Sequence, residues 1–577
     1  MESIAQHPVG IDKLGEVIET DVLVIGGGIS GLLAGIKAKD RVENVLVVDK
    51  GGIGWAGQVP LSGGDCALIR PEDAEEHFTW LVEIGEYLNH QEWTRAFAHD
   101  MYACIREAAN MGLPFWMAEG ELVSVPFHKK YKATHFSPAK IMIKLKQAAT
   151  KKNVKTLDKI FIVDLIRKHS RVVGAVGFGL VDGKTYIIKA RGTVIANGSC
   201  RYYAQRHFSV NTGEGVAMAY RAGAHLMNAE FSNTYTFGFR GDIRRRTPLY
   251  LFFENVLGER FVEKYYPEVK TGQKAGQEFL DFYRIADAMT KEVEAGRGPI
   301  FIDFRRLTHE ERLLALQSET LPPEFQPAGR GDLLKAIREK LGLDPDRERI
   351  EVELQFVGGQ GPIRIDLECR TTVDGLWAVG DAGSLGSGYT GARASGTFGG
   401  FGVPFAILSG LKGGRSAGEH AATTDRVQVD HDEAKRLRDR MLAPLGRDGD
   451  LDANDIICQL HEAMIPVKYN LHRRNGRLKE ALGKIRAARN SLARVGAADH
   501  HKLSRYHQAE SMASSAEWTL KSALMREESR GTHHREDHPA RDDKNWLKWI
   551  VIKEEDGETR FFTEPVPVER YTVKPHQ

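Results

Sequence analysis

The chain has 577 residues, a net charge of +2, 42% hydrophobic and 27% charged residues, which is typical of a soluble globular protein with several domains. The near-neutral charge does not indicate a nucleic-acid partner, and we expect none. No apolar run approaches the roughly 18 residues of a membrane span, and the N-terminus lacks a secretory signal. The five cysteines lie far apart without a C-x-x-C motif, which argues against a local metal or iron–sulfur site and favours a reducing, cytoplasmic compartment.

The stretch from residue 21 to residue 49 matches the βαβ fingerprint of dinucleotide-binding proteins. It reads as a buried apolar strand, a G-x-G-x-x-G turn that opens a helix, and a second apolar strand that ends in an acid. The glycines let the backbone approach a pyrophosphate, whose charge is stabilised at the helix N-terminus. The terminal acid, Asp49, would accept the ribose hydroxyls. The residues of the turn predicted to bind the cofactor are Gly26, Gly28, Ser30 and Gly31.

A glycine-dense segment, KGGIGWAGQVPLSGGDCALI, follows Asp49. Glycine is too frequent here for a comfortable helix or strand. We interpret the segment as a backbone sleeve around a flat cofactor; a flexible loop is the alternative. The predicted cofactor contacts in it are Lys50, Gly57, Gly63 and Gly64.

Three later turns also indicate ligand contact. A strand at 184–195 runs into Asn-Gly-Ser, which contains Gly198. The run NTGEG then precedes a helix, so that Thr212 and Glu214 lie near its start, where a carboxylate is stabilised; simple helix capping is the alternative. The third turn, VGDAG, contains Asp381 directly after an apolar strand, and a glycine-filled loop with Arg393 then leads into a helix.

Residues 231–354 differ in character from their surroundings, with arginine clusters and aromatic runs, and cofactor-type signals return after them. We therefore interpret this region as an inserted domain. The predicted parts are a nucleotide-binding domain at 1–230 and 355–415, the insertion at 231–354, a helical domain at 431–530 and a C-terminal segment at 531–577.

Together the motifs resemble the flavoprotein-subunit family of fumarate reductase and succinate dehydrogenase, which also includes L-aspartate oxidase and the flavoprotein subunit of adenylylsulfate reductase. The resemblance covers nearly the whole chain. It rests on VIGGGISG, NTGEG…YRAGA, LGERFVEKYYP, GRGPIFIDFRRL, LWAVGDAG, GARASGTFGG and ESRGTHHREDHPARDDKNWLKW. It implies an α/β fold in which a Rossmann-like FAD-binding domain is split by an α+β capping domain and followed by a helical domain and a small C-terminal domain.

The resemblance also implies roles for single residues. Arg260 in LGERF matches the active-site arginine thought to deliver a proton, and Arg393 in GARASG matches the arginine that clamps a substrate carboxylate. Asp381 and Glu214 stand where the family has acids that contact FAD. The residues expected beside the pyrimidine edge of the flavin are Thr397, Phe398 and Gly399.

This sequence departs from the family at three points. Tyr235 and Leu354 fall where the succinate and fumarate enzymes have histidines that bind a four-carbon diacid, so we expect a different carboxylate-bearing substrate. Tyr235 is a candidate hydroxyl donor to it or a packed aromatic. The stretch GWAGQVPLSGG has no histidine for covalent attachment, so we expect FAD to be bound noncovalently. His533, His534 and His538 belong to the family pattern, and no metal is expected.

Flavin N5 gives or takes a hydride, while the protein supplies position and charge. The sequence thus predicts an FAD-dependent oxidoreductase acting on CH–CH or C=C bonds, with arginines that hold the anionic group. Because free arginine stays protonated, Arg260 could act only as a relay, with Glu254 or Glu259 as proton partners.

Two alternatives remain open from the sequence. One is an adenylylsulfate-reductase-like flavoprotein, and the other is a non-catalytic FAD electron-transfer subunit. The chain has neither clustered cysteines nor a second Rossmann unit. The electron partner is therefore expected to be a separate protein, such as an iron–sulfur subunit, or a free acceptor. Through such a subunit the chain could be associated with a membrane complex.

Overall fold

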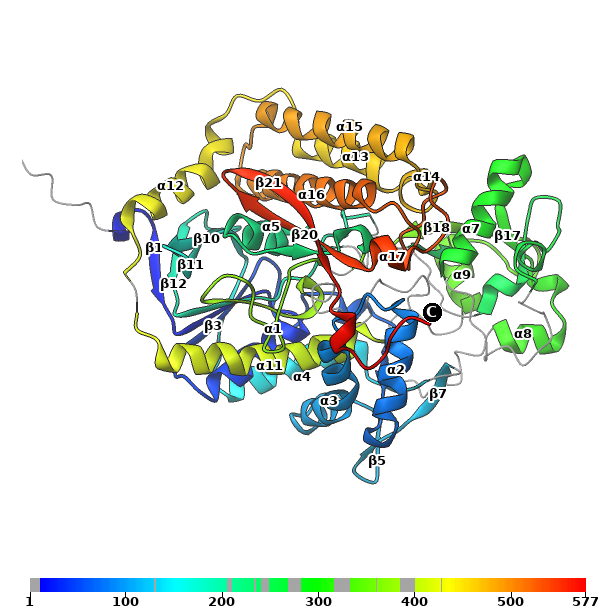
Figure 1. Ribbon diagram of the computed structural model, residues 1–577, viewed down its shortest axis with the longest axis horizontal. Helices are drawn as coiled ribbons and strands as arrows, with labels where there is room; N and C mark the ends of the chain where they lie inside the picture. Colours follow the sequence, from blue (N-terminus) through cyan, green and yellow to red (C-terminus); the bar gives the residue numbers. More distant parts are fainter. Residues whose placement is uncertain are drawn as a thin grey trace, which may run out of the picture.

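The computed structural model describes residues 11–128, 131–204, 210–232, 235–239, 248–267, 282–315, 333–359, 361–383, 400–426 and 428–576. Its centre is a five-stranded parallel sheet in the order β19-β13-β2-β3-β9 (Figure 1). The strands are β2 (Val22–Ile25), β3 (Val45–Asp49), β9 (Lys155–Asp158), β13 (Gly192–Ile195) and β19 (Leu376–Ala378). Continuous apolar runs suit these strands, because a parallel sheet is covered on both faces.

Two helices pack against this sheet and against each other: α1 (Ile29–Lys39) and α11 (Gly402–Thr423). Their approach requires glycine, since a Cβ at Gly414 would lie 2.3 Å from the carbonyl oxygen of Ala34. Strand β19 pairs in parallel with β13, with Leu376 opposite Thr193. Residues beyond 355 therefore complete a sheet that begins at residue 22, which confirms the predicted split Rossmann-like fold.

Smaller sheets surround the central one. The order β1-β12-β11-β10 forms a four-stranded sheet, and β4-β8-β7 and β5-β6 form two more. Their strands are β1 (Glu16–Glu19), β4 (Asp65–Leu68), β5 (Met117–Ala118), β6 (Glu121–Leu122), β7 (Val125–His128), β8 (Tyr131–His135), β10 (Ile160–Lys168), β11 (Arg171–Gly179) and β12 (Thr185–Lys189). The helices of this region are α2 (Ala74–Ile84), α3 (Gln91–Asn110), α4 (Pro138–Lys151) and α5 (Glu214–Arg221).

The inserted region has its own antiparallel sheet, in the order β15-β18-β17-β16, and its own hydrophobic core. It projects at the right of Figure 1 and is called the cap below. Its strands are β15 (Tyr235–Phe239), β16 (Phe253–Glu254), β17 (Ile300–Ile302) and β18 (Ile350–Phe356). Its helices are α6 (Val262–Tyr265), α7 (Phe282–Glu292), α8 (His309–Ala315) and α9 (Leu333–Leu341).

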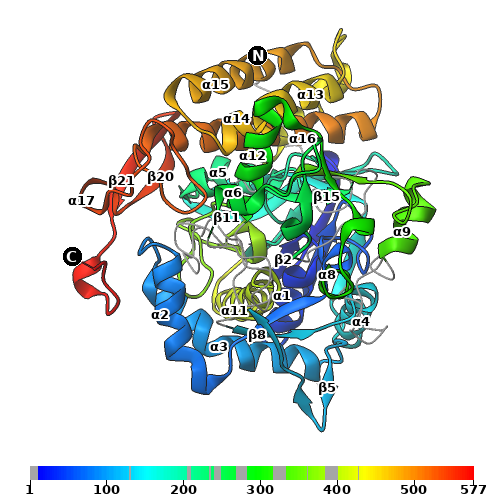
Figure 2. The same ribbon diagram turned by 90° about the vertical axis from the view of Figure 1, so that its right-hand side faces the viewer.

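A layer of helices lies across the top of Figures 1 and 2. It comprises α12 (His431–Leu442), α13 (Ala453–Met464), α14 (Val467–Asn470), α15 (Asn475–Ser491) and α16 (His500–Met525). The chain ends with α17 (Asp543–Trp546) and the hairpin of β20 (Lys548–Glu555) and β21 (Glu558–Pro565), which pairs with β14 (Leu226–Met227). Within the described ranges, the search for a helix of membrane-spanning length and hydropathy finds none.

A buried hydrogen bond joins the cap to the helical layer. Asp287 of α7 contacts His472 Nε2 at 3.0 Å, and the hydroxyl of Tyr266 donates to it at 2.6 Å. Burial opposes ionisation, but hydrogen bonds from His472, Lys291 and Tyr266 lower the pKa of Asp287 to about 2. The folded pKa lies below the unfolded value, so this carboxylate stabilises the fold above about pH 4 and the contribution is lost as the pH falls toward about 2.

We therefore expect Asp287→Asn to remove this part of the acid sensitivity. Urea midpoints measured at about pH 5 and about pH 3 should differ more in the wild type than in the variant. Equal differences in the two proteins would contradict the assignment.

Candidate cofactor site and active site

A cavity of about 690 Å³ opens beyond the carboxyl ends of β2, β3 and β13. This is the position at which open α/β sheets bind ligands. The glycine turn after β2, the glycine-dense segment and the start of α11 form much of its wall. Strand β15 of the cap and the first turns of α16 also line it, so that parts of the chain far apart in the sequence meet at one cavity.

The glycine turn has the geometry that the sequence predicted. Gly26 has a φ of 115°, and a Cβ at Gly31 would lie 1.9 Å from the carbonyl oxygen of Gly26. A Cβ at Gly28, by contrast, would meet no atom of the described residues within 4 Å apart from its own chain neighbours, although Gly28 lines the cavity. The space in front of Gly28 is therefore open for a ligand, as close approach of a pyrophosphate requires. Ser30 also lines the cavity.

Asp49, at the end of β3, faces the cavity and also holds the loops beside it. Its two carboxylate oxygens accept one hydrogen bond each, from the N–H of Gly27 and that of Gly51, both at 2.6 Å. A carboxylate has about four acceptor sites, so two of them are left for ribose hydroxyls.

Lys50, Thr212 and Glu214 form one polar group at the cavity wall. The ammonium of Lys50 donates to Glu214 at 2.5 Å and to Thr212 at 3.1 Å, and the Thr212 hydroxyl donates to Glu214 at 2.6 Å. Glu214 is buried, which opposes its ionisation, but Lys50 and Thr212 hold its pKa below the ordinary value. Glu214 and Lys50 line the cavity. Thr212 is not among the described lining residues and contacts these two side chains.

Asp381 also lines the cavity, where it pairs with Arg201. Nη2 of Arg201 donates to Asp381 at 2.8 Å and Nη1 donates to the carbonyl of Val357 at 3.3 Å. The sequence around Arg201 contains no motif that predicts this contact. Its two partners come from the part of the chain that follows the cap, far from Arg201 in the sequence. Gly198 has a φ of 77° and also lines the cavity.

The remaining predicted cofactor contacts divide into three groups. Gly57 and Gly63 line the cavity, whereas Gly64 does not and instead accepts a hydrogen bond from the N–H of Phe136 at 3.0 Å. The third group lies outside the described residues: Thr397, Phe398 and Gly399. Arg393, predicted as a catalytic residue, also lies outside them. Asn197, from the Asn-Gly-Ser turn, lines the cavity as well. Lining residues that the sequence did not single out include Trp55, Phe161, Arg505 and Gln508.

The two described catalytic candidates are placed differently from each other. Tyr235 lines the cavity, but its hydroxyl donates to the carbonyl of Ile465 at 2.7 Å, and burial raises its pKa. Arg260 is not among the described lining residues; its guanidinium binds the carboxylate of Glu311 at 2.7 Å and lies over the ring of Phe252. The structure therefore gives Tyr235 the contacts of a packed aromatic and does not bring Arg260 into this cavity.

Both ring nitrogens of His533 contact protein atoms. Its ring contacts a guanidinium nitrogen of Arg473 and the carbonyl of Arg526, at 2.6 and 3.1 Å. Over the residues whose placement is described, no cluster of His, Cys, Asp and Glu could hold a metal ion.

The fold and the cavity together define a dinucleotide-binding protein with a split Rossmann-like domain. A family model described as FAD binding domain matches residues 21–399, and one described as fumarate reductase flavoprotein C-term matches residues 459–577. The chain belongs to this family of FAD-dependent oxidoreductases, which includes fumarate reductase and succinate dehydrogenase flavoproteins, and FAD is its cofactor.

One curated relative and two solved structures resemble the chain over nearly its whole length. The chain is 26% identical to the fumarate reductase flavoprotein subunit of Mycobacterium tuberculosis, covering 96% of this chain and 98% of that protein. A mutant of E. coli quinol fumarate reductase FrdA superposes with a TM-score of 0.82 at 22% identity, covering 97% and 99% of the two chains. An adenosine-5-phosphosulfate reductase in complex with sulfite superposes with a TM-score of 0.76 at 18% identity, covering 98% of each chain.

Proposed function

We propose that the chain transfers a hydride between flavin N5 and a carboxylate-bearing substrate other than succinate or fumarate, forming or reducing a C–C double bond. The proposal rests on one observation: the cap and the glycine turn line the same cavity. Tyr235 of the cap strand β15 lines the same cavity as the glycine turn and Asp381. The cap strand thus borders the space expected for FAD, and the position of a diacid-binding histidine in the family is taken there by a tyrosine.

When bound, FAD supplies the hydride chemistry, and the protein supplies binding and charge. Gly28 and the N-terminus of α1 would receive the pyrophosphate, and Asp49 would receive a ribose. We assign Arg393 to the substrate carboxylate, as a planar bidentate clamp.

For the proton we retain a relay through Arg260. Glu254 lies opposite Arg260 in a β-bridge, is buried, and has a raised pKa because of that burial, although Arg306 opposes the shift. A carboxyl group with a raised pKa holds a proton more readily than an exposed one.

The test is anaerobic. The bound flavin is reduced chemically, a panel of α,β-unsaturated acids is added, and reoxidation is followed by absorbance. At least one acid should reoxidise the flavin, and Arg393→Met should lower kcat/KM for it by about 10²-fold or more, as loss of a charge-stabilising donor does. Arg393→Lys should retain part of the activity. A full panel without reoxidation would overturn the proposal.

An adenylylsulfate-reductase-like reaction is the second candidate, favoured by the absence of both diacid histidines. Formation of AMP and sulfite from adenylylsulfate with a reduced viologen donor would support it.

A non-catalytic electron-transfer role is the third candidate. Unchanged activity of the assembled complex after substitution of Arg260 and Arg393 would favour it. In each case we propose that a separate protein, such as an iron–sulfur subunit, exchanges electrons with this chain, and that FAD is bound noncovalently.

A further inference from the structure

Helix α4 and the residues directly after it carry an unusual excess of positive charge. Residues 138–155 contain six lysines and neither aspartate nor glutamate. Lys140, Lys144 and Lys151 are exposed, and their spacing places them along one face of α4. In the described part of the chain these three form no ion pair, whereas Lys152 pairs with Asp40 at 2.7 Å.

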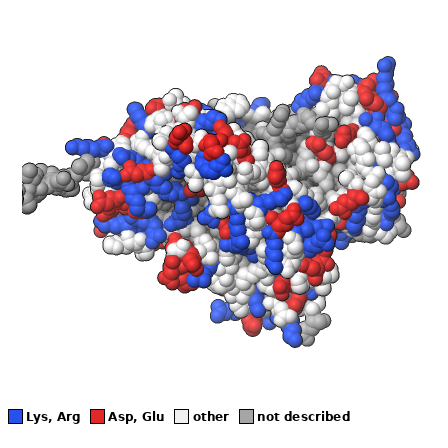
Figure 3. Space-filling model, turned by 90° about the horizontal axis from the view of Figure 1, so that it is seen from above, with Lys and Arg blue, Asp and Glu red and all other residues white. Residues whose placement is uncertain are grey.

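On helix α12, by contrast, acids balance the basic residues. On α12, Arg436 pairs with Glu433 and Lys435 pairs with Asp439, both at 2.8 Å. The face of the molecule seen in Figure 3 likewise shows Lys and Arg interspersed with Asp and Glu. The lysine face of α4 therefore differs from an ordinary solvated surface, in which both signs alternate.

This lysine face adjoins the cofactor cavity. A groove of about 620 Å³ is lined by Lys146 and Lys151 of α4 and by Trp55 of the glycine-dense segment. Trp55 also lines the cofactor cavity, and 70% of its surface is exposed. A Cβ at Gly54 would lie 3.0 Å from the side chain of Lys146, so the cavity rim lies directly against α4. Aromatic residues such as tryptophan are enriched in protein–protein interfaces relative to the rest of the surface.

We propose that the lysine face of α4, with Trp55 at its edge, is the docking surface for an acidic electron-carrier protein. The inference rests on the proposed need of the flavin for a separate electron partner. Weak electron-transfer encounters are small and are guided by charge more than by buried area. A positive face beside the cavity would raise the local concentration of an acidic carrier where electrons enter or leave.

The electron count is consistent with a one-electron carrier. In the reductive direction two carriers give one electron each, and two protons from solvent complete the conversion of a C=C bond to CH–CH. In the oxidative direction two carriers each accept one electron, and two protons are released.

The test uses the full-length FAD-loaded protein and a plant-type [2Fe–2S] ferredoxin as the acidic probe. The variant Lys140→Glu, Lys144→Glu, Lys151→Glu is compared with the matched control Arg474→Glu, Lys479→Glu, Arg486→Glu. The control changes the same charge on exposed residues at and within α15, which lies on the opposite side of the molecule from α4 (Figures 1 and 2). Flavin reduction by reduced ferredoxin is followed without substrate at about 20 mM and about 200 mM salt.

At low salt the α4 variant should reduce its flavin at least about tenfold more slowly than the wild type, and its rate should depend less on salt. The α15 control should behave like the wild type, and reduction by a small viologen should be unchanged in both. Equal rates in the α4 variant and the wild type, or equal losses in both variants, would overturn the proposal.

Binding provides a second readout that does not depend on flavin chemistry. Carbodiimide cross-links between ferredoxin carboxylates and the wild-type chain should map to Lys140, Lys144 and Lys151. Cross-links concentrated elsewhere would overturn the proposal even if no substrate of the enzyme is known. Conversely, a confirmed α4 surface on a protein that no unsaturated acid reoxidises would overturn only the proposed reaction.

Discussion

Replacing Gly28 with alanine should weaken FAD binding by about tenfold or more while leaving the fold intact. Among the described residues, a Cβ at this position meets no atom within 4 Å beyond its chain neighbours, and the backbone there has a φ of −72°, which alanine adopts freely. The added methyl group would point into the space expected for the pyrophosphate. The dissociation constant of FAD, measured by fluorescence titration of the apoprotein, tests the prediction.

Two other glycines serve as comparisons for this variant. Gly31→Ala should reduce folding yield as well as FAD binding, because its Cβ would lie 1.9 Å from a carbonyl oxygen of the turn itself. Gly483→Ala, on α15 and also without neighbours within 4 Å, should leave FAD binding unchanged and stabilise its helix by up to about 1 kcal/mol. Tight FAD binding by Gly28→Ala would show that the nucleotide does not lie against this turn.

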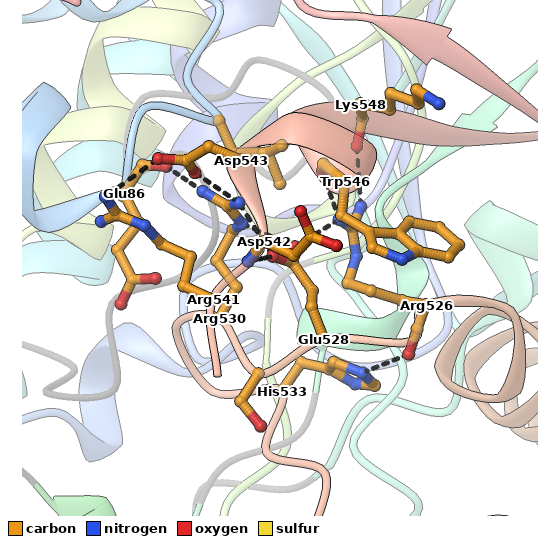
Figure 4. A network of polar contacts seen from close by, with 12 residues as sticks. Glu86, Arg526, Glu528, Arg530, His533, Arg541, Asp542, Asp543, Trp546 and Lys548 are labelled. Atoms are coloured by element: carbon orange, nitrogen blue, oxygen red, sulfur yellow. Dashed lines mark hydrogen bonds and ion pairs between the residues drawn. The ribbon is translucent and has the colours of Figure 1, made fainter. Parts of the chain in front are cut away.

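Truncating Glu528 to alanine should lower the free energy of unfolding by about 3–5 kcal/mol. Glu528 is fully buried in the polar network of Figure 4. It accepts hydrogen bonds from Arg526 at 2.9 Å, from Arg530 at 2.7 and 2.9 Å and from the N–H of Asp542 at 2.8 Å. Arg526 and Arg530 are buried as well, so the variant leaves two guanidinium groups short of a partner in a region that excludes water.

The matched control is Asp439→Ala, which removes a carboxylate from an exposed ion pair with Lys435. Its cost should stay below about 1 kcal/mol. Urea unfolding of both variants, with the slope checked against the wild type, gives the comparison. Similar small losses in both would mean that the network contributes little to stability.

The central fold could be predicted well because local and global signals agree there. The strand, turn and helix of residues 21–39 form a pattern typical of a βαβ unit. Two glycines of its turn, Gly26 and Gly31, occupy positions where a Cβ would clash with backbone atoms. The return of the chain to the same sheet at β19 followed from a second strand-and-turn signal at residues 376–383.

The walls of the cavity that come from distant parts of the chain could not be predicted in the same way. Arg201 contacts Asp381 and Val357, more than 150 residues later, and nothing in its local sequence distinguishes it from a surface arginine. Arg505 and Gln508 line the cavity only because α16 packs beside it. Such contacts depend on domain packing and not on local propensity.

The roles expected for Tyr235 and Arg260 show the same limit. Both occupy positions that a motif can mark, but their hydrogen bonds depend on which neighbour the fold supplies. The carbonyl of Ile465 accepts a hydrogen bond from the hydroxyl of Tyr235, and the carboxylate of Glu311 accepts one from the guanidinium of Arg260. The contacts of these two side chains could therefore not be predicted from sequence position, and their catalytic roles stay predictions.

Every role proposed for the residues of the site depends on FAD binding in the cavity between the glycine turn, Asp381 and the cap strand. The visible absorption spectrum of the purified chain, taken after incubation with FAD and gel filtration and followed by acid precipitation, tests this binding. We expect a yellow protein with about one FAD per chain, all of which is released into the supernatant. A colourless protein, or a flavin that stays with the precipitate, would contradict this expectation.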